Sequence, residues 1–242
     1  MTWQREPVLI YGAGGHARVV VDMVELQERH TIAGLLDDRQ ELWGQRVMGY
    51  PVLGGFETLR EARWQDCKLI IAVGGNAARQ RLAEKAASLG FQFATAIHPS
   101  AQIARDVAVG PGTVVMANTA VNPGSAIGAH VIINTGASAD HDNVVEDFAH
   151  ISVGVHLGGE VRVGCGALLG VGVSVGPQVC IGRWAIVGIG AAVIQDIPDY
   201  VTAVGVPAKP IKVHQPPETK AEAQAAIQRP QSIRKNNAQQ GD

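Results

Sequence analysis

Residues 133–168 decide the fold, because they divide into the six hexapeptides INTGAS, ADHDNV, VEDFAH, ISVGVH, LGGEVR and VGCGAL. The same period runs without interruption from Ile97 to Pro198 and gives 17 repeats. Sixteen of the 17 first positions are Ile, Val or Leu, and eight of the second positions are Gly. Inward aliphatic residues separated by turn-tolerant residues are typical of short flat β-segments joined by tight corners. Three segments and three corners make one coil of three hexapeptides, so the pattern predicts a β-solenoid of nearly six stacked coils.

The composition excludes several classes of protein. The 242 residues are 46% hydrophobic and 17% charged, which is ample material for a core. A net charge of −2 argues against a generic nucleic-acid binder. No apolar run reaches the ~20 residues that span a bilayer, and no signal-peptide pattern follows the N-terminus. The cysteines Cys67, Cys165 and Cys180 are too far apart for a disulfide framework or a zinc site. We therefore expect a cytoplasmic protein with no membrane segment and no metal.

A glycine-rich loop lies near the start of the chain, between a predicted strand and a predicted helix. The apolar run PVLIY at 7–11 leads into GAGGHA at 12–17 and then into a helical pattern at 19–27. Glycines in such a loop allow a sharp turn and a close approach of backbone amides to a phosphate at the helix N-terminus. The loop therefore predicts a nucleotide site.

Two further strand ends support this prediction. The apolar run 31–36 ends in Asp37 and Asp38, and an acid at this place can accept hydrogen bonds from ribose hydroxyls. The run 68–73 ends in glycines that open a helical pattern at 77–89. Residues 1–96 are thus expected to form a small Rossmann-like domain. A dehydrogenase is disfavoured because residues 97–198 belong to the solenoid and leave no hydride-transfer domain. A glycine turn that serves packing alone stays open as an alternative.

Seven motifs together resemble one known family. They are IYGAGGHARVV at 10–20, LLDD at 35–38, AVGGNAARQ at 72–80, IHPSA at 97–101, NTGASADHD at 134–142, HISVGVHLGG at 150–159 and GVPAKPIK at 205–212. The chain resembles the hexapeptide-repeat sugar acyltransferases of bacteria, which include UDP-4-amino-sugar N-acetyltransferases and sialic acid O-acetyltransferases. The resemblance implies an α/β plus all-β protein, with a Rossmann-like domain at 1–96 and a left-handed parallel β-helix at 97–213. We expect the Gln- and Pro-rich residues 214–242 to be disordered, with a short helix at 219–228 as the alternative.

One hexapeptide combines an irregular first position with candidate catalytic residues. Ala139 is the only first position that is not Ile, Val or Leu, and His141 and Asp142 follow in the same repeat. His141 is at a corner, where side chains can face outward. The resemblance implies that His141 is the general base for a sugar amine and that Asp142 raises its basicity. Imidazole suits this role because its ordinary pKa of ~6.5 is close to working pH. An exposed surface pair without function is the alternative.

The resemblance also implies acetyl-CoA as the acyl donor, with direct transfer and no acyl-enzyme. Corners one coil apart are separated by three hexapeptides, so Val153, Val171 and Ile189 stack on one edge. By the resemblance, the acetyl-CoA contacts are assigned to His150, Gly159, Val171 and Ile189. For Val171 and Ile189, simple turn filling stays an alternative. Cys165 and Cys180 are expected to be packing residues, and His130 and His156 ordinary surface histidines.

The two parts together predict N-acetylation of a UDP-linked 4-amino-4,6-dideoxysugar in bacterial surface glycan synthesis. The residues expected to hold the nucleotide-sugar are Gly14, Gly15, His16, Asp37, Asp38 and Gly74. The resemblance implies a homotrimer with active sites between protomers. Two alternatives remain: O-acetylation of sialic acid or a similar sugar, and a non-catalytic nucleotide-binding trimeric scaffold.

Overall fold

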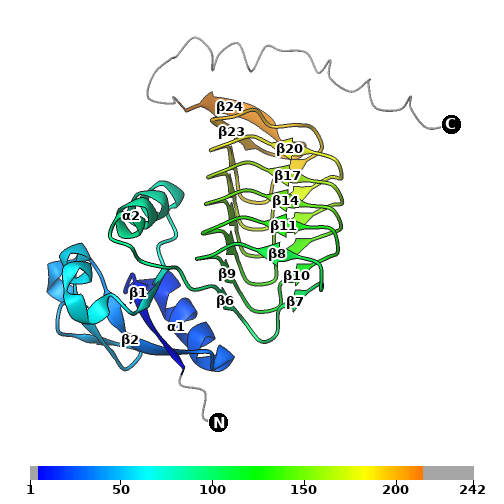
Figure 1. Ribbon diagram of the computed structural model, residues 1–242. Coiled ribbons are helices and arrows are strands. Elements are labelled where there is room, and N and C mark those ends of the chain that lie inside the picture. Colours follow the sequence, from blue (N-terminus) through cyan, green and yellow to red (C-terminus); the bar gives the residue numbers. More distant parts are fainter. Residues whose placement is uncertain (1–4, 215–242) are drawn as a thin grey trace.

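A computed structural model describes residues 5–214 as a small α/β part followed by a tall β-helix (Figure 1). The first part holds a five-stranded sheet of order β3-β4-β2-β1-β5, in which only the β3–β4 pair is antiparallel. Its elements are β1 (Glu6–Tyr11), α1 (Gly15–Gln27), β2 (His30–Leu36), η1 (Gln40–Leu42), β3 (Arg46–Val47), β4 (Tyr50–Gly54), η2 (Phe56–Arg60), η3 (Ala62–Trp64), β5 (Lys68–Ile71) and α2 (Asn76–Ser88).

The predicted strands and helices of this part are confirmed to within a few residues. Strand β1 buries four consecutive apolar side chains, as a parallel strand covered on both faces must. Helix α1 buries residues spaced three to four apart, among them Ala17, Val20 and Val24, so one stripe of the helix faces the core. The glycine loop, Asp37 and Gly74 all follow the carboxyl ends of parallel strands. These ends meet at one edge of the sheet, where ligands of open α/β sheets bind.

The β-helix consists of 17 two-residue strands in three parallel sheets, as the hexapeptide register predicted. The first sheet contains β6 (Ala96–Ile97), β9 (Val114–Val115), β12 (Ile132–Ile133), β15 (His150–Ile151), β18 (Leu168–Leu169) and β21 (Ile186–Val187). The second contains β7 (Gln102–Ile103), β10 (Ala120–Val121), β13 (Ser138–Ala139), β16 (His156–Leu157), β19 (Ser174–Val175) and β22 (Ala192–Val193). The third contains β8 (Ala108–Val109), β11 (Ala126–Ile127), β14 (Val144–Val145), β17 (Arg162–Val163) and β20 (Cys180–Ile181). Paired strands are three hexapeptides apart, and the fold is a left-handed parallel β-helix.

Three corners join the sheets, and we name them in chain order. The first corner follows the first sheet and includes Val153, the second corner follows the second sheet and includes His141, and the third corner follows the third sheet and includes Cys165. The fourth residue of every hexapeptide from Gly112 to Gly190 has a left-handed backbone with φ between 54° and 75°. The second-position glycines serve a different purpose, because a Cβ at Gly164 would lie 2.7 Å from a backbone nitrogen of the next coil. Glycine there lets successive coils approach closely.

The last coil is covered by two strands that the sequence analysis did not foresee. Strand β23 (Val201–Val204) pairs in parallel with β21, and β24 (Lys209–Val213) pairs antiparallel with β23 (Figure 1). They extend the first sheet and cover the edge of β21, which would otherwise expose unpaired backbone groups. The tail helix considered at 219–228 lies outside the described residues.

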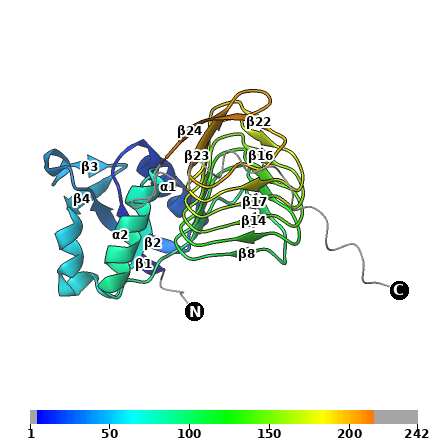
Figure 2. The ribbon, with the colours of Figure 1, turned by 90° about the horizontal axis from the view of Figure 1, so that it is seen from above.

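The α/β part packs against the first sheet and the third corner of the β-helix (Figure 2). Val20 and Val24 of α1 share a buried cluster with Val114 and Ile132 of the first sheet. Asn76, the first residue of α2, donates from Nδ2 to the carbonyl oxygens of Gly166 and Ala167 at the third corner, at 3.0 and 3.1 Å. Within residues 5–214, no helix is both long and apolar enough to cross a membrane.

Candidate active site

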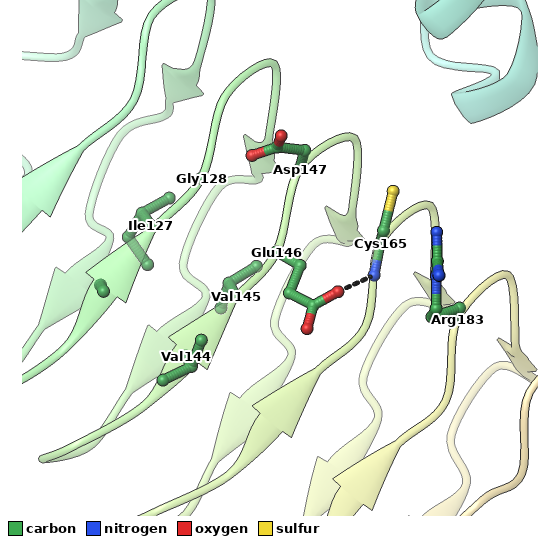
Figure 3. A pocket seen from close by; sticks show the side chains of 9 residues that line it. Ile127, Gly128, Val144, Val145, Glu146, Asp147, Cys165 and Arg183 are labelled. Atoms are coloured by element: carbon green, nitrogen blue, oxygen red, sulfur yellow. Dashed lines mark hydrogen bonds between the residues drawn. The ribbon is translucent and has the colours of Figure 1, made fainter.

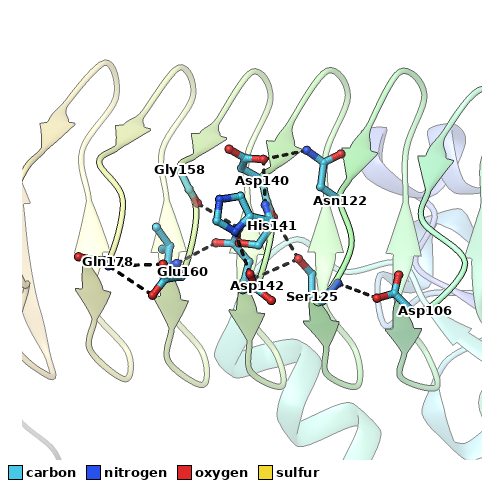
Figure 4. Close-up of polar contacts among 12 residues, drawn as sticks. Asp106, Asn122, Ser125, Asp140, His141, Asp142, Gly158, Glu160 and Gln178 are labelled. Atoms are coloured by element: carbon cyan, nitrogen blue, oxygen red, sulfur yellow. Dashed lines mark hydrogen bonds and ion pairs between the residues drawn. The ribbon is translucent and has the colours of Figure 1, made fainter. Parts of the chain in front are cut away.

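His141 and Asp142 form an exposed pair on the second corner (Figure 4). The imidazole Nδ1 lies 2.8 Å from Asp142 Oδ2, and about half of each side chain is exposed. Asp142 occupies the left-handed fourth position, with φ 58°, and its Oδ2 faces the imidazole of the preceding residue. With Nδ1 bonded to the carboxylate, Nε2 is the nitrogen left to face a substrate.

Carboxylates surround His141 and raise its pKa. The hydrogen bond with Asp142 is the largest influence that raises the pKa of His141, and the charges of Asp140, Asp142 and Glu160 raise it further. Asp140 Oδ1 accepts hydrogen bonds from Asn122 Nδ2 and from the backbone N–H of His141, both at 2.9 Å. These bonds lower the pKa of Asp140, so its carboxylate stays ionised.

Asp140, Glu160 and Asn143 are site residues that the sequence analysis missed. Asn143 is fully buried, and its Nδ2 donates to the carbonyl oxygens of Asp140 at 2.6 Å and Gly158 at 3.0 Å. Its Oδ1 accepts the backbone N–H of Val161 at 3.2 Å. Asn143 thereby ties the corner that carries His141 to the next coil. A signal for it was present, because a buried fifth position is otherwise small or β-branched.

Gly159 lies directly beside the His141 imidazole, one coil further along the second corner. A Cβ placed on Gly159 would be 2.6 Å from both Cε1 and Nε2 of His141. The assignment of Gly159 to acetyl-CoA stays a prediction.

In the α/β part, Asp37 holds the glycine loop. Gly14 is the N-cap residue of α1, and Gly15 is its first residue. Asp37 Oδ2 accepts the backbone N–H of Ala13 at 2.9 Å, and its two oxygens also receive Nε and Nη2 of Arg39, each at 2.9 Å. The Arg39 bonds are the main reason why the pKa of Asp37 is lowered. Asp37 therefore fixes the loop in addition to its predicted role toward a ribose.

Asp38 is also hydrogen-bonded within the protein. Its Oδ1 accepts the Tyr11 hydroxyl at 2.5 Å and the backbone N–H of Phe56 at 3.2 Å. Burial is the main cause that raises the pKa of Tyr11 far above its ordinary range, so the phenol remains a donor. Asp38 borders an open cavity of about 650 Å³ that Trp43, Phe56 and Lys85 also line.

His16, Gly74 and His150 meet where the α/β part contacts the first sheet. Burial is the first cause that lowers the pKa of His16 and of His150 to about 4, and nearby Arg79 lowers both further. His150 interacts with the Gly74 backbone, and its Nε2 is 3.3 Å from Asn134 Nδ2. Both imidazoles are therefore neutral near pH 7. The structure thus brings His150, predicted for acetyl-CoA, beside two residues predicted for the nucleotide-sugar.

Arg79 on α2 joins the same junction and was not foreseen as important. Its side chain is 1% exposed. Nε donates to the carbonyl oxygen of His130 at 2.8 Å, and Nη2 donates to the carbonyl oxygen of Phe148 at 2.7 Å and to Asn76 Oδ1 at 2.9 Å. Nη1 donates to the carbonyl oxygen of Val73 at 3.0 Å. Arg79 thus ties the Gly74 loop to two successive third corners.

The expectation for His130 is wrong, whereas His156 is exposed as expected. His130 is only 5% exposed and stacks on Phe148, with ring centroids 5.1 Å apart. Its left-handed corner position turns the ring over Gly112, where no Cβ obstructs it. The docked α/β part then covers it, with Phe93 packed edge-on at 4.4 Å.

The first corner exposes a row of aliphatic side chains. Val153, Val171 and Ile189 are 42%, 47% and 79% exposed, and their spacing of three hexapeptides stacks them as expected. Such a row on a surface is typical of a binding or subunit face. The predicted acetyl-CoA contacts of Val171 and Ile189 are compatible with this exposure.

A shallow groove of about 460 Å³ lies over the third sheet and reaches the third corner (Figure 3). Cys165, Glu146 and Arg183 line it, and Glu146 Oε2 accepts the backbone N–H of Cys165 at 2.9 Å. Burial is the main cause that raises the pKa of the Cys165 thiol. A protonated thiol is a weak nucleophile, which agrees with a packing role. Within residues 5–214, no group of three or more His, Cys, Asp or Glu side chains could hold a metal ion.

Comparisons with known proteins show the family to which this chain belongs. Residues 7–86 match the PglD N-terminal domain family. A structure of perosamine N-acetyltransferase from Caulobacter crescentus is 42% identical, covers 85% of this chain and 97% of its own, and superposes with a TM-score of 0.81. It contains CoA and GDP-perosamine, and the protein is a variant with a histidine replaced by asparagine. The chain belongs to the hexapeptide-repeat sugar acyltransferase family.

Other members of the family extend the comparison. The acetyltransferase domain of PglB from Neisseria gonorrhoeae FA1090 is 35% identical, covers 86% of this chain and all of its own, and has a TM-score of 0.80; it has also been solved with acetyl coenzyme A. UDP-N-acetylbacillosamine N-acetyltransferase of Bacillus subtilis (strain 168) is 42% identical over 105 residues, or 43% of this chain. The match spans 48% of that relative.

Proposed function

We propose that this protein is an acetyl-CoA-dependent N-acetyltransferase that acts on the amino group of a nucleotide-linked 4-amino-4,6-dideoxysugar. The observation that carries the proposal is the exposed His141–Asp142 pair, with its Nδ1–Oδ2 distance of 2.8 Å. The membership of the family supports the reaction class. A role in bacterial surface glycan synthesis follows from the acceptor. Cys67 and Cys165 are free thiols, which is compatible with a reducing cytoplasmic setting.

His141 is proposed as the general base. The neutral amine attacks the thioester carbonyl carbon, and His141 Nε2 takes one proton from the amine nitrogen. The C–N bond forms, the C–S bond breaks, and the CoA sulfur leaves and ends as a thiol. Asp142 supports this step because a carboxylate at Nδ1 stabilises the imidazolium that forms. An acyl-enzyme on Cys165 is disfavoured because Cys165 lies on the third corner, away from the second corner that carries His141, and burial raises the pKa of its thiol.

The charge around His141 favours an amino-sugar over sialic acid. Asp140, Asp142 and Glu160 all act on the imidazole, so the second corner is locally negative. A negative field attracts a cationic ammonium group and repels the carboxylate that sialic acid carries. The same histidine could remove a proton from a hydroxyl of sialic acid, but the carboxylate of sialic acid would be repelled by the carboxylates around His141. The scaffold alternative leaves the arrangement of His141 and Asp142 without a role.

The nucleotide-sugar is proposed to bind at the carboxyl edge of the α/β sheet. Gly14, Gly15, His16 and Gly74 line this edge with the loop that Asp37 holds. Asp38 lies beside the cavity of about 650 Å³. UDP is the nucleotide we propose, as in the name of the Bacillus subtilis relative, whereas the Caulobacter crescentus relative binds GDP-perosamine.

A homotrimer is proposed because the two predicted sites lie on different edges of one β-helix. Asn76, next to the Gly74 loop, contacts the third corner, and His16 of the glycine loop lies near His150 of the first sheet, whereas His141 is on the second corner. One hexapeptide separates neighbouring corners, or about 20 Å at ~3.3 Å per residue. In a trimer, the second corner of one protomer can place its His141 beside the nucleotide-sugar that a neighbouring protomer binds. The exposed row Val153, Val171 and Ile189 supports such a contact.

Thiol release from acetyl-CoA with a panel of acceptors tests the proposal. The panel contains UDP- and GDP-linked 4-amino-4,6-dideoxysugars, the matching sugars without the amino group, and sialic acid. We expect release with an amino-sugar nucleotide and little with the others. Release with sialic acid alone would favour the O-acetyltransferase, and no release with any acceptor would favour the scaffold. Light scattering on the same preparation measures the oligomeric state.

A further inference from the structure

The glycine at position 159 stands where the backbone does not need one. Its φ is outside the left-handed region, whereas its neighbour Glu160 has a φ of 60°. The equivalent position on the second corner is proline at Pro123 and at Pro177. The proline ring fixes φ in the ordinary negative range, so this corner accepts an L-residue at that place. The absence of a side chain at Gly159 therefore has another cause.

The cause lies in the side chain stacked against it. A Cβ on Gly159 would meet Cε1 and Nε2 of His141 at 2.6 Å and Cδ2 at 3.2 Å. These are ring atoms on the edge that faces away from Asp142, which holds Nδ1 at 2.8 Å. The imidazole is thus fixed at one nitrogen by Asp142 and lies with the other nitrogen over the bare backbone of Gly159.

Other corners show the same stacking of a side chain over a glycine. His130 lies over Gly112 and Trp184 lies over Gly166, and the two members of each pair occupy equivalent positions in successive coils. In both, the glycine belongs to the preceding coil and has a left-handed φ, so the backbone also favours glycine. The His141 ring differs from these two in two ways. It lies over a glycine of the following coil, and the backbone of that glycine is not left-handed.

We infer that Gly159 is a positioning residue. Because it has no side chain, it leaves the space that the His141 imidazole occupies and so determines the position of Nε2. This inference rests on the proposed function, since it assigns Nε2 the proton transfer. Restoring ordinary van der Waals contact from 2.6 Å to 3.4 Å requires Nε2 to move by about 0.8 Å. Glycine at position 159 is then required for the reaction geometry and not for the fold.

Gly159→Ala is the direct test, and Gly176→Ala is its matched control. Gly176 is on the same second corner, and a Cβ there would lie 3.4 Å from its closest neighbour, the carbonyl oxygen of Val193. We expect Gly159→Ala to lower kcat by about 10²-fold, the typical effect of a misplacement near 1 Å, with an unchanged melting temperature. Gly176→Ala should keep the wild-type kcat. A raised KM for acetyl-CoA with normal kcat would instead show that Gly159 is only a CoA contact and would overturn the inference.

Two further measurements separate this inference from the proposed function. On a His141→Ala background, Gly159→Ala should cause no additional loss of residual rate, because it acts through the imidazole; an additive loss would contradict it. NMR titration of the His141 imidazole needs no substrate. A changed pKa or chemical shift of the His141 imidazole in Gly159→Ala, absent in Gly176→Ala, supports the positioning role of Gly159 even if the acceptor is not an amino-sugar. An unchanged imidazole signal would overturn it.

Discussion

Arg79→Met removes the guanidinium that joins α2 to two coils of the β-helix while keeping an apolar side chain of similar length. Every hydrogen-bond acceptor that Arg79 meets is neutral. They are the amide oxygen of Asn76 and the backbone carbonyls of Val73, Gly74, His130, Phe148 and Ala149. The variant therefore leaves several buried acceptors without a donor. The expected result is a destabilised contact between the Gly74 loop and the third corner.

The magnitude follows from the hydrogen bonds that the variant loses. The three shortest bonds of Arg79, at 2.7 to 2.9 Å, contribute about 6 kcal/mol together, at about 2 kcal/mol net for a hydrogen bond to a charged group. This net value already includes the hydration that the guanidinium loses on burial, which also lowers the pKa of Arg79 to about 10. The free energy of unfolding should therefore fall by up to about 6 kcal/mol.

Urea unfolding followed by tryptophan fluorescence measures this loss, because the described α/β part contains Trp43 and Trp64. Arg81→Met is the control, since Arg81 is exposed on the same helix and should change stability by less than ~0.5 kcal/mol. In the acetyl-transfer assay, Arg79→Met should raise KM for the nucleotide-sugar more than KM for acetyl-CoA. A loss below ~1 kcal/mol, or equal changes in both KM values, would refute the view that Arg79 holds the loop through charged hydrogen bonds.

Four other outcomes are expected. His141→Ala should lower kcat by about 10²–10⁴-fold without changing the melting temperature, and near-normal turnover would remove it from the mechanism. The base must be neutral and its pKa is raised, so the rate should fall as the pH drops through that raised value; Asp142→Asn should move this acid limb to lower pH, and an unmoved limb would argue against the pair. Gly14→Val should raise KM for the nucleotide-sugar and spare that for acetyl-CoA, whereas matched losses measured for both would indicate misfolding. Removing 216–242 should preserve folding and catalysis because β23 and β24 already cover the last coil; aggregation on size-exclusion chromatography would contradict this.

Much of this protein could be read from local sequence patterns. A period of six residues determines the β-helix because each short segment must bury one aliphatic residue and then turn. Strands β1, β2 and β5 were predictable from continuous apolar runs, which are typical of parallel strands buried on both faces. His141 and Asp142 are neighbours in the chain, so their pairing was predictable as well.

The tertiary structure decided the contacts between residues that are distant in the chain. Arg79 meets carbonyl groups 51 and 69 residues away, and His150 meets the Gly74 loop. His130 is buried by a docked part of the chain, which no period of six residues encodes. Gly159 faces His141 because it occupies the same corner position one coil later and the imidazole leans toward that coil. Periodicity determines which residues share an edge, but the direction of each side chain and the docking of one part on another depend on packing in three dimensions.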